Sequence, residues 1–380
     1  MTFLYILLAL LVFGLLVMIH ELGHFLVARL FGVGIREFSI GMGPKLFSWK
    51  GKKKWGEPDP EADHKVPPVA FDENESVPEP EDYRTTYSLR LLPIGGYVSM
   101  VGEDEESEHP AAFGQKNVWK RIAIVVAGAF MNILLGFLLM LVFVLSTRDA
   151  NGIILASNTV AEFTEGATSS QWLQEGDVIT HVNGTRVHTG NEVIYEIMNQ
   201  GYEPLDLTVE RDGKELLLND VVFPGMVNED IPEGVSFGAT DFKVYREAAG
   251  FGSVMKHTFF RSLSTVKMIF DQLGDLLTGR FGLDAVSGPI GITEEMGNAA
   301  KSGFASFLYL VIVITINLGV FNLLPIPALD GGRLLFLLIE AIIRRPVNPK
   351  VEGYIHFAGL MILFGIMILV ACKDIAGLFA

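Results

Sequence analysis

The stretch VMIHELGHFLVARLFG (residues 17–32) places two histidines and a glutamate at the end of an uncharged apolar run that begins at Thr2. As a helix, a run of this length nearly crosses a hydrocarbon core of roughly 30 Å, because each residue rises about 1.5 Å. Ionisable side chains are costly at such a depth and are usually functional there. The stretch therefore predicts a membrane-embedded fold with a polar site in it.

The composition agrees with a membrane protein. The 380 residues are 50% hydrophobic and 19% charged, and their mean hydropathy is +0.38, which is too apolar for one ordinary soluble domain. Three more uncharged runs, 122–145, 304–329 and 357–372, bring the number of predicted spans to four. The net charge of -15 argues against nucleic acid as a partner.

Flanking charges predict how the spans are oriented. The first run lacks a basic n-region and a small-residue cleavage site, so we interpret it as a span and not as a cleaved signal peptide. The single cysteine, Cys372, leaves no intrachain disulfide to indicate a compartment. Basic residues cluster on one side of the spans, at Arg29, Arg36, Lys45, Lys116, Lys120, Arg121, Arg344, Arg345 and Lys350. By the positive-inside rule, both termini and the 147–303 loop are expected outside.

His20, Glu21 and His24 form a His-Glu-x-x-His pattern. On a helix the two histidines are one turn apart and can bind one zinc ion, while the glutamate lies beside them as a general base for water. The five-residue pattern alone is a weak signal, because in many soluble chains such histidines are merely solvated. Its position at the end of an apolar run favours a zinc site.

A catalytic zinc usually has three protein ligands, and the best third candidate is Asp330 in FNLLPIPALDGG (321–332). Asp330 could instead merely cap a helix beginning at Gly331, although capping and ligation do not exclude each other. Glu340 and His356 are weaker alternative ligands. With one span between them, the first and third spans run in the same direction, so His20 and Asp330 are expected at the same inner depth.

The loops contain two predicted β-rich elements. WLQEGDVITHVNGTRV (172–187) predicts a strand and an Asn-Gly hairpin turn, followed by a helix, as in a PDZ domain over 147–225; any small β-rich domain with the same turn is the alternative. Residues 83–102 predict a hairpin that bends at Pro93–Gly96 and dips into the membrane. Residues 52–82 are rich in proline and charge and predict a flexible insert.

Together these motifs resemble the bacterial site-2 proteases, intramembrane zinc metalloproteases of the regulator-of-sigma-E-protease type. The resemblance covers nearly the whole chain. It rests on His20-Glu21-x-x-His24, Gly128-x-x-x-Asn132, Asn322-x-x-Pro325-x-Pro327-x-x-Asp330-Gly331, the PDZ-like unit and VSGPIGI (286–292).

The resemblance implies that His20, His24 and Asp330 bind one Zn²⁺, that Glu21 activates water, and that Asn322 contacts the substrate backbone or the developing oxyanion. Asn322 could alternatively satisfy backbone groups freed by the prolines. We interpret Asn132 as a helix-packing residue beside Gly128. The 83–102 hairpin matches the family's re-entrant β-loop, where an extended substrate can add as a strand. The expected substrate-binding residues there are Leu92, Gly95, Gly96, Tyr97 and Val98.

The predicted fold class is a multi-span α-helical membrane protein with four transmembrane helices, a re-entrant β-hairpin and one extracytoplasmic PDZ-like α+β domain. The predicted segments are 1–32 (first span), 33–117 (cytoplasmic loop), 118–146 (second span), 147–225 (PDZ-like), 226–303 (amphipathic connector), 304–331 (third span), 332–352 (cytoplasmic) and 353–380 (fourth span). The chain departs from the family pattern in two places. It has a single PDZ-like unit where close relatives have two, and its 52–82 insert has no counterpart. These two departures limit which family properties carry over to this chain.

The resemblance also implies a location and partners. The chain is expected in the bacterial cytoplasmic (inner) membrane, with its active site near the cytoplasmic side. Expected partners are the lipid bilayer and single-span membrane proteins already cut on the outer side, such as anti-sigma factors or signal-peptide remnants. Two rival functions are a metal transporter or sensor that uses the same histidines, and a catalytically silent PDZ scaffold.

Overall fold

The computed structural model describes residues 2–54, 84–103, 107–150, 152–200, 203–226, 237–280 and 287–377. The chain divides into two compact units. Unit 1 comprises residues 1–134 and 318–366, and unit 2 comprises residues 135–317 and 367–380. Except for residues 52–54, the predicted flexible insert lies outside the described residues.

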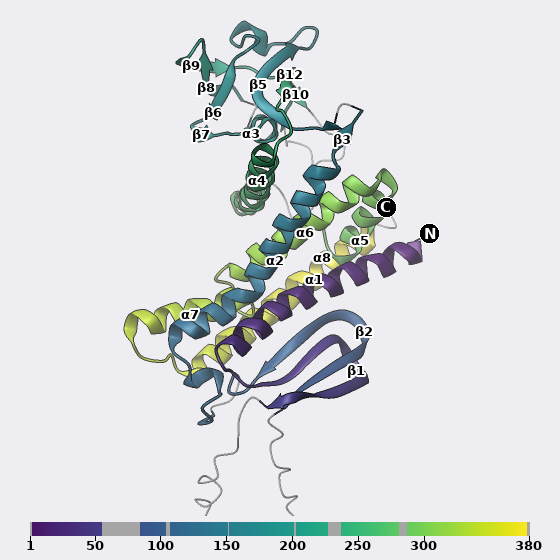
Figure 1. Cartoon of the computed structure of the whole chain (residues 1–380), viewed down its shortest axis with the longest axis vertical. Helices are drawn as coiled ribbons and strands as arrows, with labels where there is room; N and C mark the ends of the chain where they lie inside the picture. Colours follow the sequence, from purple (N-terminus) through teal and green to yellow (C-terminus); the bar gives the residue numbers. More distant parts are fainter. Residues whose placement is uncertain are drawn as a thin grey trace, which may run out of the picture. The chain divides into compact units, whose positions relative to one another are not determined.

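Four helices in the described part of the chain are long and apolar enough to cross a membrane, each with an 18-residue window of mean hydropathy between 2.3 and 2.5. They are α1 (Thr2–Leu30), α2 (Val118–Ser146), α6 (Phe304–Leu323) and α8 (Pro349–Gly377) (Figure 1). Large apolar side chains such as Leu11, Leu138 and Ile362 remain exposed on them, as expected where lipid is the solvent. The predicted multi-span helical fold is confirmed.

The third span ends earlier than the sequence predicted. α6 stops at Leu323, and Asp330 begins a separate helix, α7 (Asp330–Ile343), so 304–331 is not one helix. The reason is the Leu-Pro-Ile-Pro run that follows α6, because proline has no N–H to continue helical bonding. The predicted cytoplasmic stretch 332–352 is therefore mostly helical.

The hairpin of unit 1 also differs from the prediction. Residues 83–102 do not close on themselves. Instead β2 (Arg84–Met100) pairs antiparallel with β1 (Ile35–Lys54), and Phe38 of β1 has both Val98 and Tyr87 as partners. The first part of β1 thus lies between the two halves of β2, and residues 96–100 form an outer edge of the sheet. β2 packs against α1 (Figure 1).

Unit 2 contains a six-stranded sheet of order β12-β5-β6-β8-β9, with β7 paired to β6. Its strands are β5 (Ala156–Phe163), β6 (Val178–Val182), β7 (Thr185–Arg186), β8 (Leu205–Arg211), β9 (Lys214–Val221) and β12 (Phe242–Arg246). The predicted turn is present between β6 and β7, where Asn183 and Gly184 both have positive φ. Helix α3 (Gly190–Gln200) follows, as predicted.

The domain boundary at 225 was wrong. β12 pairs with β5, and Phe242 lies in the same apolar core as Ile179 and Val209, so the domain continues to Arg246. The predicted connector 226–303 accordingly contains strands as well as helices. The remaining elements are η2 (Phe113–Gln115), β3 (Arg148–Asp149), β4 (Gly152–Ile153), η3 (Ser169–Gln171), β10 (Gly225–Met226), β11 (Phe237–Gly238), α4 (Phe251–Thr278) and α5 (Pro289–Ser302).

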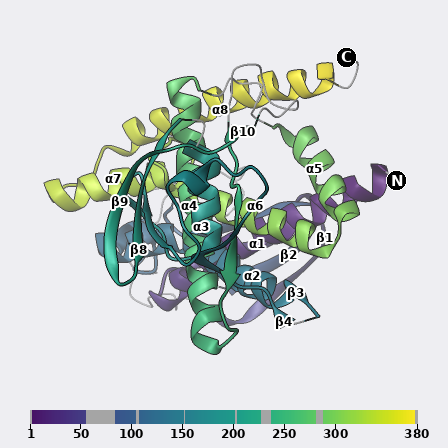
Figure 2. The ribbon, with the colours of Figure 1, turned by 90° about the horizontal axis from the view of Figure 1, so that it is seen from above.

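Helix α4 is attached to the β domain through α3, and the two helices lie side by side (Figure 2). Lys267 of α4 places its Nζ 3.0 Å from Glu196 Oε1 of α3. Tyr195 of α3 donates a hydrogen bond of 2.7 Å to Asp271 of α4. Burial, followed by the hydrogen bond and the negative charge of Asp271, raises the pKa of the Tyr195 hydroxyl. These contacts make α4 part of the domain and not a free linker.

Candidate metal centre

Helix α1 carries the three residues of the histidine motif in its C-terminal half. His20 and His24 are one turn apart and nearly buried, with 6% and 7% of their surfaces exposed. Their Nε2 atoms lie 3.1 Å from each other. Because the i and i+4 positions of a helix share a face, this proximity follows directly from the sequence spacing.

Asp330, at the first turn of α7, completes the group. Its Oδ2 lies 2.9 Å from His20 Nε2 and 3.2 Å from His24 Nε2. Among the described residues this is the one group of histidine, cysteine or acidic side chains whose ligand atoms converge so closely, all within 4.8 Å. The structure thus brings together residues that are 310 positions apart in the sequence.

The residues fit a zinc ion. Ligand atoms about 2.0–2.2 Å from a tetrahedral zinc lie about 3.3 Å apart, close to the spacings observed between these three atoms. The His24 Nδ1–H donates to the backbone oxygen of Ile124 at 2.8 Å. The Nε2 lone pair of His24 therefore points into the cluster, as metal ligation requires.

Asn132 of α2 indicates that the Nε2 lone pair of His20, like that of His24, points into the cluster. Its Nδ2 lies 3.3 Å from His20 Nδ1, while its buried Oδ1 has no hydrogen-bond partner among the described residues. Rotating the amide by 180° exchanges these atoms, so that Oδ1 accepts from His20 Nδ1–H and leaves Nε2 as the ligand. The sequence predicts only a packing role for Asn132, although the four-residue spacing from Gly128 places both on one helix face.

Gly128 explains how α2 approaches the histidines so closely. A Cβ at this position would contact His24 Nε2 and would lie 2.7 Å from His20 Nε2. Such a distance is shorter than a van der Waals contact, so only glycine fits without displacing the rings. The Gly128-x-x-x-Asn132 pattern thus supplies both the space beside the cluster and a polar neighbour for it.

Glu21 follows His20 on α1 and contacts β2. Its Oε2 accepts a hydrogen bond of 3.1 Å from the backbone N–H of Val98. Of the five substrate-binding residues predicted within 83–102, Gly95, Gly96, Tyr97 and Val98 lie at or near this edge of the sheet. Leu92 pairs with Met42 of β1, and 47% of its surface is exposed.

The predicted oxyanion contact, Asn322, is half-buried in the last turn of α6. Within the described residues its side chain has no hydrogen bond with His20, Glu21, His24 or Asp330. The structure therefore does not join Asn322 to the cluster, and its role stays a prediction.

The two weaker ligand candidates are engaged elsewhere. Glu340 forms a two-pronged ion pair with Arg121 of α2. His356 of α8 accepts a hydrogen bond of 2.9 Å from the backbone N–H of Ala328, which has a φ of 74°. His356 therefore holds the turn that precedes Asp330, and neither residue belongs to the group of converging ligands described above.

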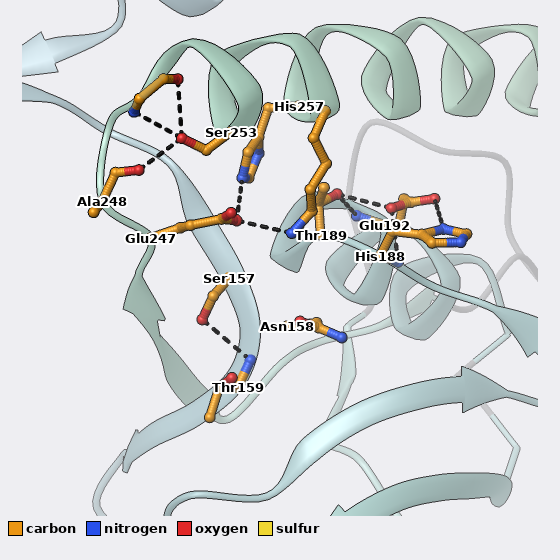
Figure 3. A network of polar contacts seen from close by, with 12 residues as sticks. Ser157, Asn158, Thr159, His188, Thr189, Glu192, Glu247, Ala248, Ser253 and His257 are labelled. Carbon is orange, nitrogen blue, oxygen red and sulfur yellow. Dashed lines mark hydrogen bonds and ion pairs between the residues drawn. The ribbon is translucent and has the colours of Figure 1, made fainter.

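Unit 2 contains a second set of histidines and carboxylates. Figure 3 shows Glu247 facing His257, with an oxygen-to-Nε2 distance of 3.1 Å, and His188 facing Glu192. Burial raises the pKa of Glu247, but hydrogen bonds from Lys256 and His257 outweigh this and lower it overall. Beside this network, His181, Arg186, Glu210 and Lys256 are among the residues lining an open groove of about 750 Å³.

Comparison with known proteins agrees with this chemistry. The sequence profile of Peptidase family M50 matches residues 8–55 and 78–366. The chain is 31% identical, in an alignment 452 positions long, to zinc metalloprotease RasP of Shouchella clausii; the alignment covers 97% of this chain and 98% of the relative. It is 32% identical to zinc metalloprotease RasP of Geobacillus kaustophilus and 29% identical to regulator of sigma-W protease RasP of Bacillus subtilis, covering 97% of each chain in both cases.

Proposed function

Because the chain belongs to Peptidase family M50 and is a zinc metalloprotease, we propose that it hydrolyses a peptide bond of single-span membrane proteins within the membrane. The proposed substrates have already been shortened by a cut on the outer side. The main support is the convergence of Asp330 with His20 and His24, which lie on α1, a helix long and apolar enough to span a bilayer.

In this proposal His20, His24 and Asp330 hold one zinc ion, with Asn132 and the Ile124 carbonyl orienting the two imidazoles. When bound, zinc supplies Lewis acidity to the scissile carbonyl and makes a water molecule more acidic. Glu21 takes the proton from the attacking water and passes it to the leaving amine. Asn322 contacts the substrate backbone or the developing oxyanion.

The sheet formed by β1 and β2 provides the place where the substrate is held. A transmembrane helix hides its peptide carbonyls in its own hydrogen bonds, so it must unwind before it is cut. An extended segment can then add as a strand to the edge formed by residues 96–100. The support is the position of this edge beside Glu21. Gly95, Gly96, Tyr97 and Val98 line it, and Leu92 contacts the substrate or lipid at the bend.

The β domain of unit 2 acts outside the membrane as a PDZ-like filter or binder of the shortened end. Its strand, Asn-Gly turn, strand and helix in sequence support this assignment. The basic residues flanking the spans support placing both termini outside and the active site near the cytoplasmic side. Exposed Phe259, Leu263 and Phe270 share one face of α4, which suits a helix lying on the bilayer surface.

The test is Glu21→Gln in the full-length protein, reconstituted with a single-span substrate that has a shortened outer end. We expect cleavage to fall by about 10²–10⁴-fold. The zinc content, measured by mass spectrometry, should stay at about one ion per chain, as for a site that holds a single zinc ion. The metal is retained because Glu21 is not among the three converging ligands.

Glu294→Gln is the matched control, since Glu294 is an exposed carboxylate on α5. It should leave both cleavage and zinc content unchanged. Normal cleavage by Glu21→Gln would contradict the mechanism. Cleavage of soluble peptides with no cleavage of the membrane substrate would contradict the assigned substrate class.

A further inference from the structure

Two backbone N–H groups on the edge strand that is proposed to hold the substrate already donate hydrogen bonds to carboxylates. The Val98 N–H donates to Glu21 Oε2 at 3.1 Å, and the Met100 N–H donates to Glu103 Oε2 at 3.3 Å. Residues two apart in a strand direct their N–H groups to the same side. Both donors therefore lie on the edge that faces away from β1.

The Glu21 side chain lies beside this strand. A Cβ added to Gly96 would be 3.8 Å from Glu21 Cγ, so the glutamate stem passes beside Gly96 before its carboxylate meets the Val98 amide. The second acceptor, Glu103, forms an ion pair with Arg333 of α7, three residues after Asp330. The two acceptors thus connect the edge strand to the helices that contribute the metal ligands.

We propose that the Val98 amide is a latch that holds the general base until substrate arrives. A substrate strand that adds to this edge needs the same N–H as a donor for its own carbonyl. One N–H cannot donate at full strength to two acceptors, so the incoming carbonyl displaces the Glu21 carboxylate. The freed carboxylate then accepts from the attacking water. The inference rests on the proposed function, because it assumes that substrate binds by strand addition.

The latch makes the base available only in the presence of a bound strand. Substrate binding must also replace a hydrogen bond that already exists, so the net free energy of binding is less favourable. Removing the acceptor should therefore strengthen docking, although it abolishes hydrolysis. This opposite effect on binding and catalysis is what separates a latch from an ordinary positioning contact.

The test compares Glu21→Ala with Glu21→Gln in the zinc-loaded, full-length protein in detergent. Both variants lack the base, but the Gln side chain can still accept from Val98. The probe is a fluorescein-labelled transmembrane peptide of about 25 residues, and its affinity is measured by fluorescence anisotropy. We expect Glu21→Ala to bind it about three- to tenfold more tightly, the effect of one neutral hydrogen bond.

The same two Glu21 variants are then compared in a protein that also carries Val98→Pro. Proline removes the N–H and is tolerated on strand edges, so the difference between the two Glu21 variants should disappear. Val98→Ala keeps the N–H and should preserve the difference. A gap that persists in Val98→Pro would mean that the smaller side chain simply leaves more room, and would overturn the latch.

Hydrogen exchange gives a second measurement that does not depend on how well Val98→Pro folds. In the peptide-free protein, exchange over residues 96–100 should be faster in Glu21→Ala than in Glu21→Gln, and bound probe should slow both. Equal probe affinities for the two variants would overturn the latch alone. Absence of probe binding and of exchange protection in every variant would overturn strand addition itself, and with it this part of the proposed function.

Discussion

Two regions of this chain bring histidines and carboxylates together in different ways. In unit 1, His20, His24 and Asp330 direct three ligand atoms at one point. In unit 2, Glu247 meets His257 through a single oxygen and nitrogen. The first arrangement places several electron-rich atoms against one another, and these repel unless a cation lies among them. The second is satisfied by one shared proton.

The difference shows that closeness of a histidine to a carboxylate is not in itself a sign of a metal. His188 and Glu192 are also four residues apart, but His188 precedes α3, and the 3.4 Å contact between them links this residue to the first turn of the helix. What marks a metal site is the convergence of a third ligand from a distant part of the chain. Each prediction below tests or sharpens this contrast.

The largest expected effect comes from removing one ligand. His24→Ala should lose its zinc and reduce cleavage below detection, because two remaining ligands do not hold a catalytic zinc. His257→Ala in unit 2 should keep the zinc content of the unmodified protein. Metal analysis of the two purified variants checks this. Equal zinc loss in both would erase the contrast between the two regions.

The next effect concerns the space beside the cluster. Gly128→Ala should lower cleavage by about 10²-fold, because the added methyl group must push the ligating rings out of position. Gly365→Ala is the control: no atom in the described part of the chain lies within 4 Å of the added group, so activity should not change. Cleavage assays of both variants would decide, and full activity in Gly128→Ala would mean that the helices can separate at little cost.

A smaller effect is expected from the residue that orients His20. Asn132→Ala should weaken zinc binding by about 10–100-fold, as is usual when a partner of a ligating histidine is removed. Competition with a chelator measures the change. Asn132→Asp retains an oxygen acceptor and should lose less. If the two variants bind zinc equally, then Asn132 only packs between helices, as predicted from the sequence.

The smallest expected effect is on how the stability of unit 2 depends on pH. Burial lowers the pKa of His257 below its ordinary 6.5, although the hydrogen bond and charge of Glu247 oppose this; the charges of Lys256 and Arg261 add to the lowering. The unfolded chain therefore binds this proton at higher pH than the folded chain, and stability decreases as the pH falls through 6.5. The lowered pKa of Glu247 extends the decrease below its ordinary 4.5, because the folded carboxylate resists protonation.

The measurement is hydrogen exchange of peptides covering β6 and β8 at several pH values. His257→Gln cannot bind the proton, so it should lose the part of the decrease that lies near pH 6.5 and keep the part below pH 4.5. Zinc content over the neutral range should be the same in both proteins. A stability profile that is unchanged by the substitution would contradict the assignment to His257.

Much of the candidate site was predictable from local patterns. The apolar run with His20 and His24 one helical turn apart needs no long-range information. The prolines before Asp330 also lie in plain view, although the predicted third span ran through them to residue 331. The strands and turn around Asn183 and Gly184 were likewise correct. The errors concerned strands whose pairing partners lie far away in the sequence. β1 was missed because its glycines and lysines do not show a clean alternation, and β12 because it lies beyond the segment that looked like a domain.

By itself, then, the sequence determined the presence of four spans, the histidine pair one turn apart on the first, and the strand, Asn-Gly turn and helix within the β domain, because hydropathy and periodicity act between near neighbours. Only the tertiary structure decided that Asp330 lies against His20 and His24, that Asn132 and Gly128 adjoin them, and that the Val98 amide meets Glu21. These contacts join residues up to 310 positions apart. They depend on how helices and strands pack, which no local pattern contains.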